Sequence, residues 1–507
     1  MKKWKKILAA SMAAALTVSS LAGCGKKESA KSGGEQEIEI AVWNAGLGTA
    51  WLDAMISAFE EKHPEYKVTY TATASVTAVT AGFRNEDSDT VDIYMAVKEY
   101  DTEYQEPLDD VLDSTVEGES KSLREKIDSA YLDLEKAEDG KVYELAFGGG
   151  SMSFVYNKKM FEEAGIRTIP RTTDELASAC DALISADMTP ICHFQTSGYW
   201  DFMNEVWFAQ YEGMDYYKDT FYKNPSKETF TKEDGRYEVM KACEKIVTPD
   251  YVLPGSNSTD HVTMQTRFLN GEAAMMINGS WLANEMASIA GVDDFAIMKT
   301  PVISSITNKL ETVKLETDLR KVIVAIDSVV DGETDIAQYQ DGDNYKVDGL
   351  SVSATDWDYI RKARYTVANN FSGQSMFIPS YSDAKEGAKE FMKFIYSDEG
   401  CKIYSNVLHA TLPVQLSEGT YDTKDWNAYE LAMYNLTQQA EQVATEYIMS
   451  KDKIFWQGGA RSFANYQFIN KFCANNAVDR RNASQAWSEM VAQIENDYKN
   501  NWLANVK

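Results

Sequence analysis

Cysteine and histidine are both scarce in this chain, which has six of the first and four of the second among 507 residues. One cysteine closes the N-terminal segment, and an odd number remains, which argues against a framework of disulfide bonds. Neither residue type has a spacing that matches a zinc site. The sequence therefore predicts buried thiols, no metal site and no cofactor, and it leaves a bridge between Cys180 and Cys192 open. The remaining cysteines are Cys180, Cys192, Cys243, Cys401 and Cys473, and the histidines are His63, His193, His261 and His409.

Long apolar runs are missing beyond the N-terminus, because none reaches the ~18 residues that a membrane-spanning helix needs. The N-terminus itself has a basic stretch, an Ala-rich apolar stretch from 7 to 20, and then Leu21-Ala22-Gly23-Cys24. This order is typical of an export signal that is removed. The tetrapeptide resembles a bacterial lipobox, which implies cleavage before Cys24 and acyl chains on its sulfur. We therefore expect a lipid anchor at Cys24 on the extracellular face of the bacterial cell membrane. The alternative is an ordinary secretory peptide followed by a chance cysteine.

Positive charge is in short supply, with 50 Lys and Arg against 78 Asp and Glu and a formal net charge of −28. Removal of residues 1–23 takes away four lysines and no acid, which lowers the net charge to −32. Such a surface repels nucleic acid phosphates and anionic lipid head groups. The charge therefore argues against nucleic acid as a partner, and it leaves the lipid anchor as the only expected membrane contact.

Strands and helices alternate after a polar tether that ends at residue 37. IEIAVW (38–43) predicts a strand, residues 49–64 an amphipathic helix, and YKVTYTAT (66–73) a second strand. A strand, helix and strand of this spacing form a parallel pair with a right-handed crossover. VDIYMAV (91–97) predicts a further strand, so this part is α/β.

A second set of elements follows the glycines at 148–150, which lie between predicted strands at 142–147 and 151–156. Consecutive glycines in this position indicate a bend or a close backbone approach. Residues 273–277 predict a buried strand, Asn278-Gly279 a turn, and Ser280 the N-cap of a helix that begins at Trp281. Helices are also predicted at 200–210 and 237–247. Between 302 and 370 we expect helices around a hairpin or loop, and the chain from 385 onward is mainly helical with a break at 455–459.

Several segments in this order resemble the extracellular solute-binding proteins of ABC transporters, in the carbohydrate-binding group that includes maltose-binding protein. RFLNGEAAMMINGSWL (267–282) is especially similar to that group's Phe, Gly, Ala-Met, Gly-x-Trp pattern. The other segments that carry the resemblance are IEIAVWNAGLGTAWLDAMISAFEEKHPEYKV, VDIYMA with EPLDDVL, DGKVYELAFGGGSMSFVYNKKMFEEAG, TTDELASACDAL with TPICHF, and AKEFMKFIYSDEG. The resemblance covers nearly the whole mature chain.

The resemblance implies an α/β fold of two lobes, the type II periplasmic-binding-protein-like fold, with a ligand cleft between the lobes and hinge crossings. We expect crossings near 145–150, 298–301 and 377–379. The expected boundaries are 1–23 for the signal peptide, 24–37 for the lipidated cysteine and tether, 38–147 plus part of 302–410 for the N-terminal lobe, 148–301 plus about 411–507 for the C-terminal lobe, and 302–370 for an insertion of unassigned lobe.

Aromatic residues at strand and helix ends are the first candidates for binding a sugar. A pyranose has an apolar face that packs on Trp or Tyr, and hydroxyls that need amides and carboxylates as partners. Trp281 follows a strand at the edge where ligands bind in open α/β sheets, although core packing is the simpler role for any one of 11 Trp residues. The resemblance adds Tyr199 and Trp200, because QTSGYW (195–200) is similar to the family's aromatic cleft segment. The full set of predicted ligand-binding residues is Trp281, Tyr199, Trp200, Trp43, Asn44, Trp456, Gln457, Gln195, Glu99 and Asp101.

The crossing strand departs from maltose-binding protein, which has a carboxylate near the position of Gly150. Glycine there removes a hydrogen-bonding group, and we expect it to open space in the cleft. The ligand would then differ from maltose in the same pose.

An enzyme is the main alternative function. A lipid-anchored glycosidase needs two carboxylates across a glycosidic bond, and 78 acidic residues leave such a pair open. Ser382 and Lys385 match an SxxK pattern, but the only KSG, at 31–33, lies in the tether. The chain has no GxSxG elbow and no P-loop, so ATP hydrolysis is expected in partner subunits.

A binding protein for a non-sugar solute is the second alternative, because acidic and aromatic clefts also suit polyamines. Residues 341–344 with Asp348 give a weak calcium pattern that lacks the Glu at the twelfth loop position. The sequence favours a monomeric, non-enzymatic receptor that captures a sugar or oligosaccharide and delivers it to an ABC permease with separate ATPase subunits.

Overall fold

The computed structural model describes residues 35 to 502, except 45, 87–89, 100, 196–198, 223–225, 287–293, 370, 418 and 445–467. The chain divides into a short N-terminal unit, Met1–Glu35, and a compact unit, Gln36–Lys507, which contains every strand and helix of the described residues. The predicted signal peptide, Cys24 and most of the tether lie outside the described residues. In the described part of the chain, no helix combines the length and the apolar character that a membrane span requires.

The first lobe is built on a five-stranded sheet in the order β2-β1-β3-β12-β4. β1 (Gln36–Trp43) pairs in parallel with β2 (Tyr66–Thr73) along its whole length, which confirms the predicted strand, helix and strand unit. β3 (Ile93–Ala96) lies parallel on the other side of β1. β12 (Ser375–Phe377) and β4 (Leu145–Ala146) complete the sheet with antiparallel pairing.

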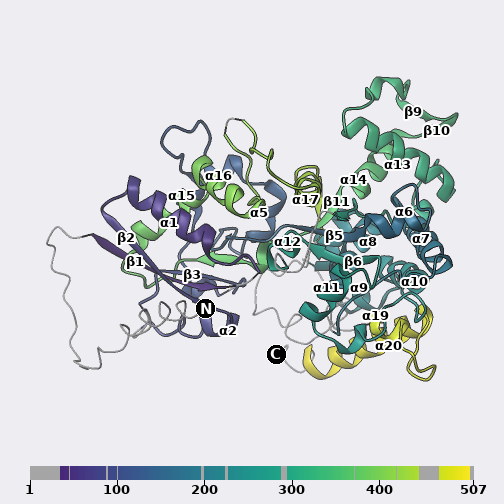
Figure 1. The fold of residues 1–507 in the computed structure, drawn as a ribbon, viewed down its shortest axis with the longest axis horizontal. Coiled ribbons are helices and arrows are strands. Elements are labelled where there is room, and N and C mark those ends of the chain that lie inside the picture. The colour runs from purple at the N-terminus through teal and green to yellow at the C-terminus, as the bar shows by residue number, and fades with distance from the viewer. Residues whose placement is uncertain are drawn as a thin grey trace, which may run out of the picture. The chain divides into compact units, whose positions relative to one another are not determined.

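Helix α1 (Ala50–Lys62) buries Trp51, Leu52, Met55 and Phe59 because these apolar residues recur at helical spacing. It packs on α16 (Asp398–Leu408) and α15 (Lys385–Ile395), which come from the far end of the sequence. Figure 1 shows these three helices beside β1–β3. The short helices of this lobe are α2 (Val76–Val79), α3 (Asp109–Asp113), α4 (Leu123–Lys126) and α5 (Ser129–Glu135).

The second lobe has β5 (Ser151–Asn157) at the centre of a sheet in the order β13-β11-β5-β6. β6 (Met275–Gly279) and β11 (Thr366–Asn369) flank β5 in antiparallel pairing, and β7 (Phe295–Ile297) pairs with its far end. β13 (Gln442–Val443) lies parallel to β11. The prediction of a turn at Asn278-Gly279 is wrong, because both residues still pair with β5, at Ser153 and Met152.

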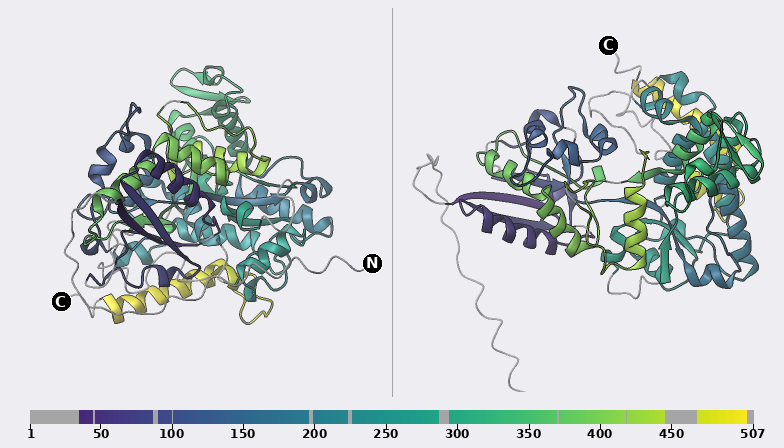
Figure 2. Two further views of the ribbon diagram at one scale, coloured as in Figure 1. Left: turned by 60° about the vertical axis from the view of Figure 1, so that its left-hand side comes forward. Right: turned by 90° about the horizontal axis from the view of Figure 1, so that it is seen from above.

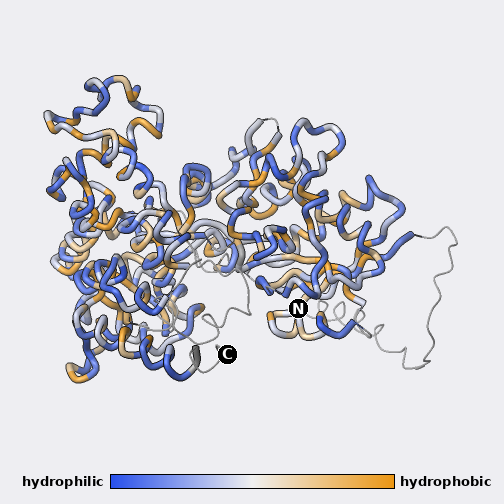
Figure 3. The backbone as a smooth tube through the Cα atoms, turned by 180° about the vertical axis from the view of Figure 1, so that it is seen from behind, coloured by the Kyte–Doolittle hydropathy of each residue, from blue (hydrophilic) through white to orange (hydrophobic). Residues whose placement is uncertain are grey.

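Helices cover this second sheet, and α8 (Trp200–Glu212) packs on β11 and on α10 (Gly235–Ile246). Figure 2 shows α20 (Ala483–Asp497), in yellow, beside the teal helices of this lobe, and α20 contacts α10. In Figure 3 hydrophobic and hydrophilic residues alternate along the helices, as expected of elements that bury one face. The other helices are α6 (Lys158–Glu163), α7 (Thr173–Ser185), α9 (Lys227–Thr231), α11 (His261–Leu269), α12 (Trp281–Glu285), α17 (Ala428–Gln438) and α19 (Phe468–Phe472).

The segment between 302 and 370 belongs with the second sheet. It contains α13 (Glu316–Val330), a small sheet of β8 (Gln340–Asp341), β9 (Asn344–Val347) and β10 (Leu350–Val352), and α14 (Ala354–Arg364). α14 packs on α8, and α13 packs on α14 (Figure 1). Tyr345 of β9 stacks on Trp357 of α14 with ring centroids 4.3 Å apart, which attaches the small sheet to the lobe.

The chain crosses between the sheets at 147–150, at 371–374 and between α16 and α17. The predicted crossing at 298–301 is wrong, because β7 and Val302 both remain in the second lobe, where Val302 bridges to Thr172. The predicted crossing at 377–379 lies a few residues too late, because β12 already belongs to the first sheet. The residues that line a cavity of about 30 Å³ include Ser151, Phe371 and Val414, and each of these three lies in or next to a different crossing.

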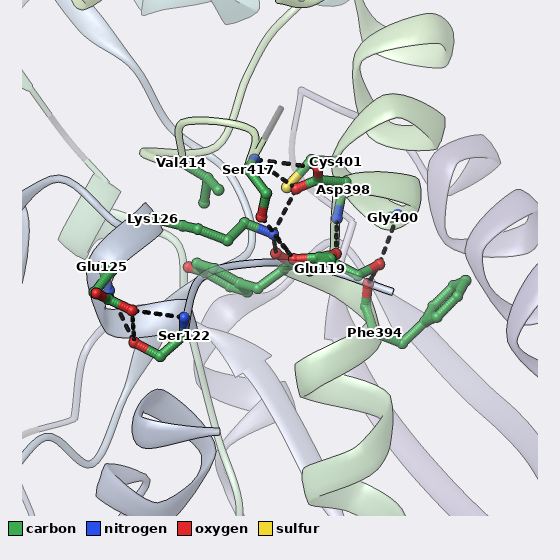
Figure 4. A network of polar contacts seen from close by, with 12 residues as sticks. Glu119, Ser122, Glu125, Lys126, Phe394, Asp398, Gly400, Cys401, Val414 and Ser417 are labelled. Carbon is green, nitrogen blue, oxygen red and sulfur yellow. Dashed lines mark hydrogen bonds and ion pairs between the residues drawn. The ribbon is translucent and has the colours of Figure 1, made fainter. Parts of the chain in front are cut away.

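A buried ionic network fixes the third crossing to the first lobe (Figure 4). The Lys126 side chain is fully buried, and its ammonium lies 2.5 Å from Glu119 Oε2 and 2.7 Å from Asp398 Oδ1. The same carboxylates accept hydrogen bonds from backbone amides, Glu119 from Asp398 at 2.6 Å and Asp398 from Ser417 at 3.0 Å. Both acids are therefore compensated, and the loop that leads to α17 is held against the start of α16.

The five described cysteines are free thiols and all are buried, so Cys180 and Cys192 are not bridged in this structure. Burial raises the pKa of each thiol, to about 12 for Cys401 and to about 11 for Cys473. These cysteines have the packing role that the sequence predicts.

Candidate functional site

Trp281 and Tyr199 meet at the end of β6 and form an aromatic corner. The two rings lie edge to face with centroids 5.5 Å apart, and Phe194 contacts Tyr199 in the same way at 5.2 Å. Trp281 is 6% exposed. Its indole lies over Gly279, where an added Cβ would come within 2.3 Å of the ring. Glycine at 279 is therefore required for the indole to take this position.

A polar cluster lies beside this corner, around Glu285 at the other end of α12. Gln265 Nε2 donates to Glu285 Oε2 at 3.0 Å, and His261 Nε2 lies 3.8 Å from Glu285 Oε1. Burial raises the pKa of Glu285, and burial together with the Glu285 charge raises the pKa of Tyr199 to about 12. Gln265 Oε1 is buried and has no hydrogen-bond donor among the described residues. The cluster therefore presents acceptors next to aromatic rings.

The first lobe contacts α12 directly. An added Cβ on Gly46, in the loop after β1, would lie 3.4 Å from Glu285 Cβ, and Asn284 Nδ2 donates to the Leu408 carbonyl of α16 at 3.1 Å. The aromatic corner and the polar cluster thus lie where the two lobes approach one another.

The glycines of the first crossing do not open space, which corrects the expectation about Gly150. An added Cβ on Gly148 would lie 2.1 Å from Gln374 Oε1 and 2.5 Å from Leu47 Cδ1. An added Cβ on Gly150 would lie 2.5 Å from Ser280 Oγ. The absent side chains allow neighbouring residues of both lobes to pack on the crossing backbone.

Trp200 and Trp43 do not join the aromatic corner. Trp200 is 1% exposed and packs edge to face on Phe154 with centroids 5.6 Å apart, so it is a core residue and offers no surface to a ligand here. Trp43 is half-buried in the first lobe, where its Nε1 donates to the Ala74 carbonyl at 3.3 Å. Asn44, the next residue, is exposed, and its backbone amide donates to Thr73.

The predicted polar residues are divided between the lobes. Gln195 is exposed, and its carbonyl accepts a hydrogen bond from Asn470 Nδ2 at 2.9 Å. Glu99 and Asp101 of the first lobe both pair with Arg84. Trp456 and Gln457 lie outside the described residues.

Phe194, His261, Gln265 and Glu285 were not predicted as site residues. Glu285 had a usable signal, because residues four apart on a helix lie on one face and Glu285 is four residues after Trp281. The other three come from different elements, and only the tertiary fold brings them together.

The serine and the lysine of the SxxK pattern each have an acidic partner. Ser382 Oγ donates to Asp92 Oδ1 at 2.6 Å, while Lys385 pairs with Glu106 at 3.2 Å. The hydroxyl therefore points to a carboxylate rather than to the lysine that would have to activate it. Residues 341–344 form the turn between β8 and β9, and within the described residues no group of three or more His, Cys, Asp or Glu is arranged to hold a metal ion.

A separate pocket of about 370 Å³ lies between the end of α8 and the start of α10. Its charged side chains largely satisfy one another, since Lys309 pairs with Glu212 at 2.8 Å and Lys241 with Glu238 at 2.6 Å.

Comparisons with known proteins agree with this architecture. The family model described as bacterial extracellular solute-binding protein matches residues 45–401. The chain is 24% identical to a protein of Brucella abortus (strain 2308) whose name describes it only as a binding protein, over 292 residues that make up 56% of this chain and 65% of that protein. It is 24% identical to the xylose/arabinose-binding protein XacG of Haloferax volcanii over 255 residues, which are 47% of this chain and 52% of XacG. The chain thus spans less than two thirds of the length of each relative.

A solved structure with the same fold is BlMnBP1, a binding protein of an ABC transporter from Bifidobacterium animalis subsp. lactis, in complex with mannobiose. The TM-score is 0.58 at 18% identity, and the match covers 92% of this chain and 95% of BlMnBP1. The likeness extends over both lobes and confirms the two-lobed α/β fold. Because the family model spans most of the chain, the chain belongs to the bacterial extracellular solute-binding protein family.

Proposed function

We propose that this protein captures a sugar or oligosaccharide between its two lobes and delivers it to the membrane permease of an ABC transporter. The observation that carries the proposal is the aromatic corner of Trp281 and Tyr199 beside the acceptors of Glu285 and Gln265. Rings that pack on a C–H face, next to groups that accept from hydroxyls, are the two components that sugar recognition needs.

Access to this site requires movement of the lobes. Trp281 is 6% exposed while α12 contacts Gly46 and Leu408 of the first lobe. Hinge closure around a ligand is a recurrent motion of two-lobed binding proteins. A ligand that contacts both lobes would stabilise the closed form over the open one.

Related proteins support the choice of ligand class. One relative carries the name of a xylose/arabinose-binding protein, and the structural neighbour was solved with mannobiose. We extend a sugar ligand to this chain on the strength of the corner and the polar cluster. Anchoring through Cys24 and delivery to a permease with separate ATPase subunits are further parts of the proposal.

A thermal-shift screen with mono- and oligosaccharides tests the proposal, because a ligand that binds only the folded state raises the melting temperature. We expect a sugar to raise Tm in a concentration-dependent way and to bind stoichiometrically in calorimetry, with no product after long incubation. A shift with spermidine and with no sugar would instead favour a polyamine receptor, and turnover of an oligosaccharide would favour an enzyme.

A further inference from the structure

We propose that Ser280 is a positioning residue that couples the ligand helix α12 to the first hinge crossing, through its hydrogen bond to the Gly149 carbonyl. The inference rests on the proposed function in one respect, namely that the ligand contacts Trp281, the residue next to Ser280. The hydrogen bond would transmit the effect of ligand contact at Trp281 to the hinge.

Ser280 is the N-cap residue of α12, as the sequence predicts, but its side chain does not cap the helix. Its side chain makes no hydrogen bond to its own helix, and Oγ instead donates to the Gly149 carbonyl at 3.0 Å. The residue lies at the N-cap position of α12, between the last residue of β6 and Trp281. The hydroxyl therefore joins the ligand helix to a crossing segment that is 131 residues away in sequence.

Two glycines give the crossing the backbone conformation that brings it close to this hydroxyl. Gly149 and Gly150 have φ values of 112° and 155°, which side-chain-bearing L-residues rarely adopt. A Cβ at Gly150 would collide with Ser280 Oγ at 2.5 Å, so the Ser280 side chain packs directly on the backbone of the crossing. A rotation about these glycines would change the distance from the Gly149 carbonyl to Ser280.

Two further hydrogen bonds hold the same helix and strand end. Tyr429 of α17 donates its hydroxyl to the Gly279 carbonyl at 2.7 Å, and Asn284 donates to Leu408 of the first lobe at 3.1 Å. α17 comes directly after the third crossing. The residues on either side of Trp281 are thus bonded to the first crossing, to the element after the third crossing and to the first lobe.

Loss of the Ser280 hydroxyl should loosen the crossing without removing any group of the aromatic corner. A neutral hydrogen bond of ordinary strength changes a two-state ratio by about fivefold. We therefore expect Ser280→Ala to raise the open population of the 148–151 backbone by about that factor.

Hydrogen exchange on the full chain tests the coupling without a ligand. Ser280→Ala is compared with Ser178→Ala, a matched control because Ser178 Oγ also donates to a backbone carbonyl, that of Asp174, at 2.9 Å on an exposed helix face. The measured quantity is the exchange rate of the 148–151 amides relative to the amides of β6. We expect this ratio to rise about fivefold in Ser280→Ala and to stay at the wild-type value in Ser178→Ala.

The ratio decides the outcome even if Ser280→Ala destabilises the whole fold, because global unfolding would accelerate β6 as well. An unchanged ratio overturns the coupling. With a bound sugar, protection of 148–151 in the wild type and weaker protection in Ser280→Ala would support it, whereas equal protection in both overturns it and leaves sugar binding intact. If no sugar binds, the ligand-free ratio still tests the coupling, so the two proposals fail separately.

Discussion

At the scale of single residues, Trp281 tests the location of the ligand site. Truncating a buried aromatic contact costs about 1–3 kcal/mol of binding energy, so we expect Trp281→Ala to weaken the affinity for an identified sugar accordingly, as measured by calorimetry. Trp43→Ala is the comparison, because Trp43 also lies at the end of a strand but stands outside the aromatic corner. Unchanged affinity in Trp281→Ala would place the ligand elsewhere.

Glu144 links stability to pH. It is buried just before β4, where its Oε1 accepts from the Glu99 amide and from Gln105 Nε2, both at 2.9 Å. Burial raises its pKa from the usual 4.5 to about 7. Between these values the folded state holds a proton that the unfolded state has released, so this group stabilises the fold below about pH 4.5 and the contribution is lost as the pH rises through 7.

We therefore expect the unfolding free energy of the wild type to fall between pH 4.5 and 7, and Glu144→Gln to remove up to about 3 kcal/mol of that decline. Denaturant titrations across this range provide the measurement. Glu125→Gln serves as the control, because hydrogen bonds from Ser122 lower the pKa of the exposed Glu125. Parallel pH profiles for the wild type and Glu144→Gln would contradict the assignment.

At the residue scale, local patterns and the family resemblance selected the candidate ligand-binding residues, and the structure shows how these residues pack. Trp281 was selected because it follows a strand, and Tyr199 because its segment resembles the family's aromatic cleft segment; the two rings are in contact. Trp200 is the next residue of the same segment, but its ring packs in the core against Phe154. Which neighbour in such a pair faces the core depends on helix rotation, and residue order alone does not determine it.

At the scale of elements, periodicity predicted the long strands and helices of both lobes, including β1, α1 and β2. It failed at 142–147, where only Leu145–Ala146 is strand, and at the end of β6. Asn278-Gly279 is a common turn pair, yet here the glycine is needed for contact with the indole and the strand continues through it. The small residue at 279 serves tertiary packing, which a turn rule does not take into account.

The ionic network of Figure 4 gives a stability prediction for the join between α4 and α16. Lys126→Met removes the buried cation between Glu119 and Asp398, and leaving buried charges uncompensated costs about 3–5 kcal/mol. Lys62→Met is a matched control, because Lys62 pairs with Glu399, the neighbour of Asp398, in an exposed position. An exposed pair contributes about 0–1 kcal/mol, so urea unfolding should separate the two variants clearly. Similar midpoints for both would refute the importance of burial here.

At the scale of the whole molecule, the resemblance in sequence predicted two lobes correctly and placed the crossings only in part. The glycines at 148–150 carry a local signal for the first crossing. The second and third crossings lack such a signal, because the strands and helices on either side are ordinary and only their pairing partners reveal the lobe. The segment 302–370 could not be assigned from periodicity for the same reason.

Anchoring of the molecule is predicted from the lipobox resemblance alone. We expect Cys24→Ser to prevent lipid attachment, so that the protein expressed in a bacterial host partitions into the aqueous phase after detergent phase separation while the wild type stays with the detergent. Ser19→Ala, within the apolar stretch, is the control and should leave partitioning unchanged. Aqueous partitioning of the wild type would indicate an ordinary secretory signal instead.

The packing around the first crossing also limits how this chain can vary. A side chain at each of positions 148, 149 and 150 would meet a different obstacle. At 148 it would collide with the side chains of Gln374 and Leu47, at 149 it would strain a backbone with positive φ, and at 150 it would collide with the Ser280 hydroxyl. If the codons for these positions are randomised and the library is selected for folded secreted protein, we expect glycine to be recovered at all three. Changes that adapt the site to new ligands are therefore expected in the surrounding loops and not in the crossing segment 148–150.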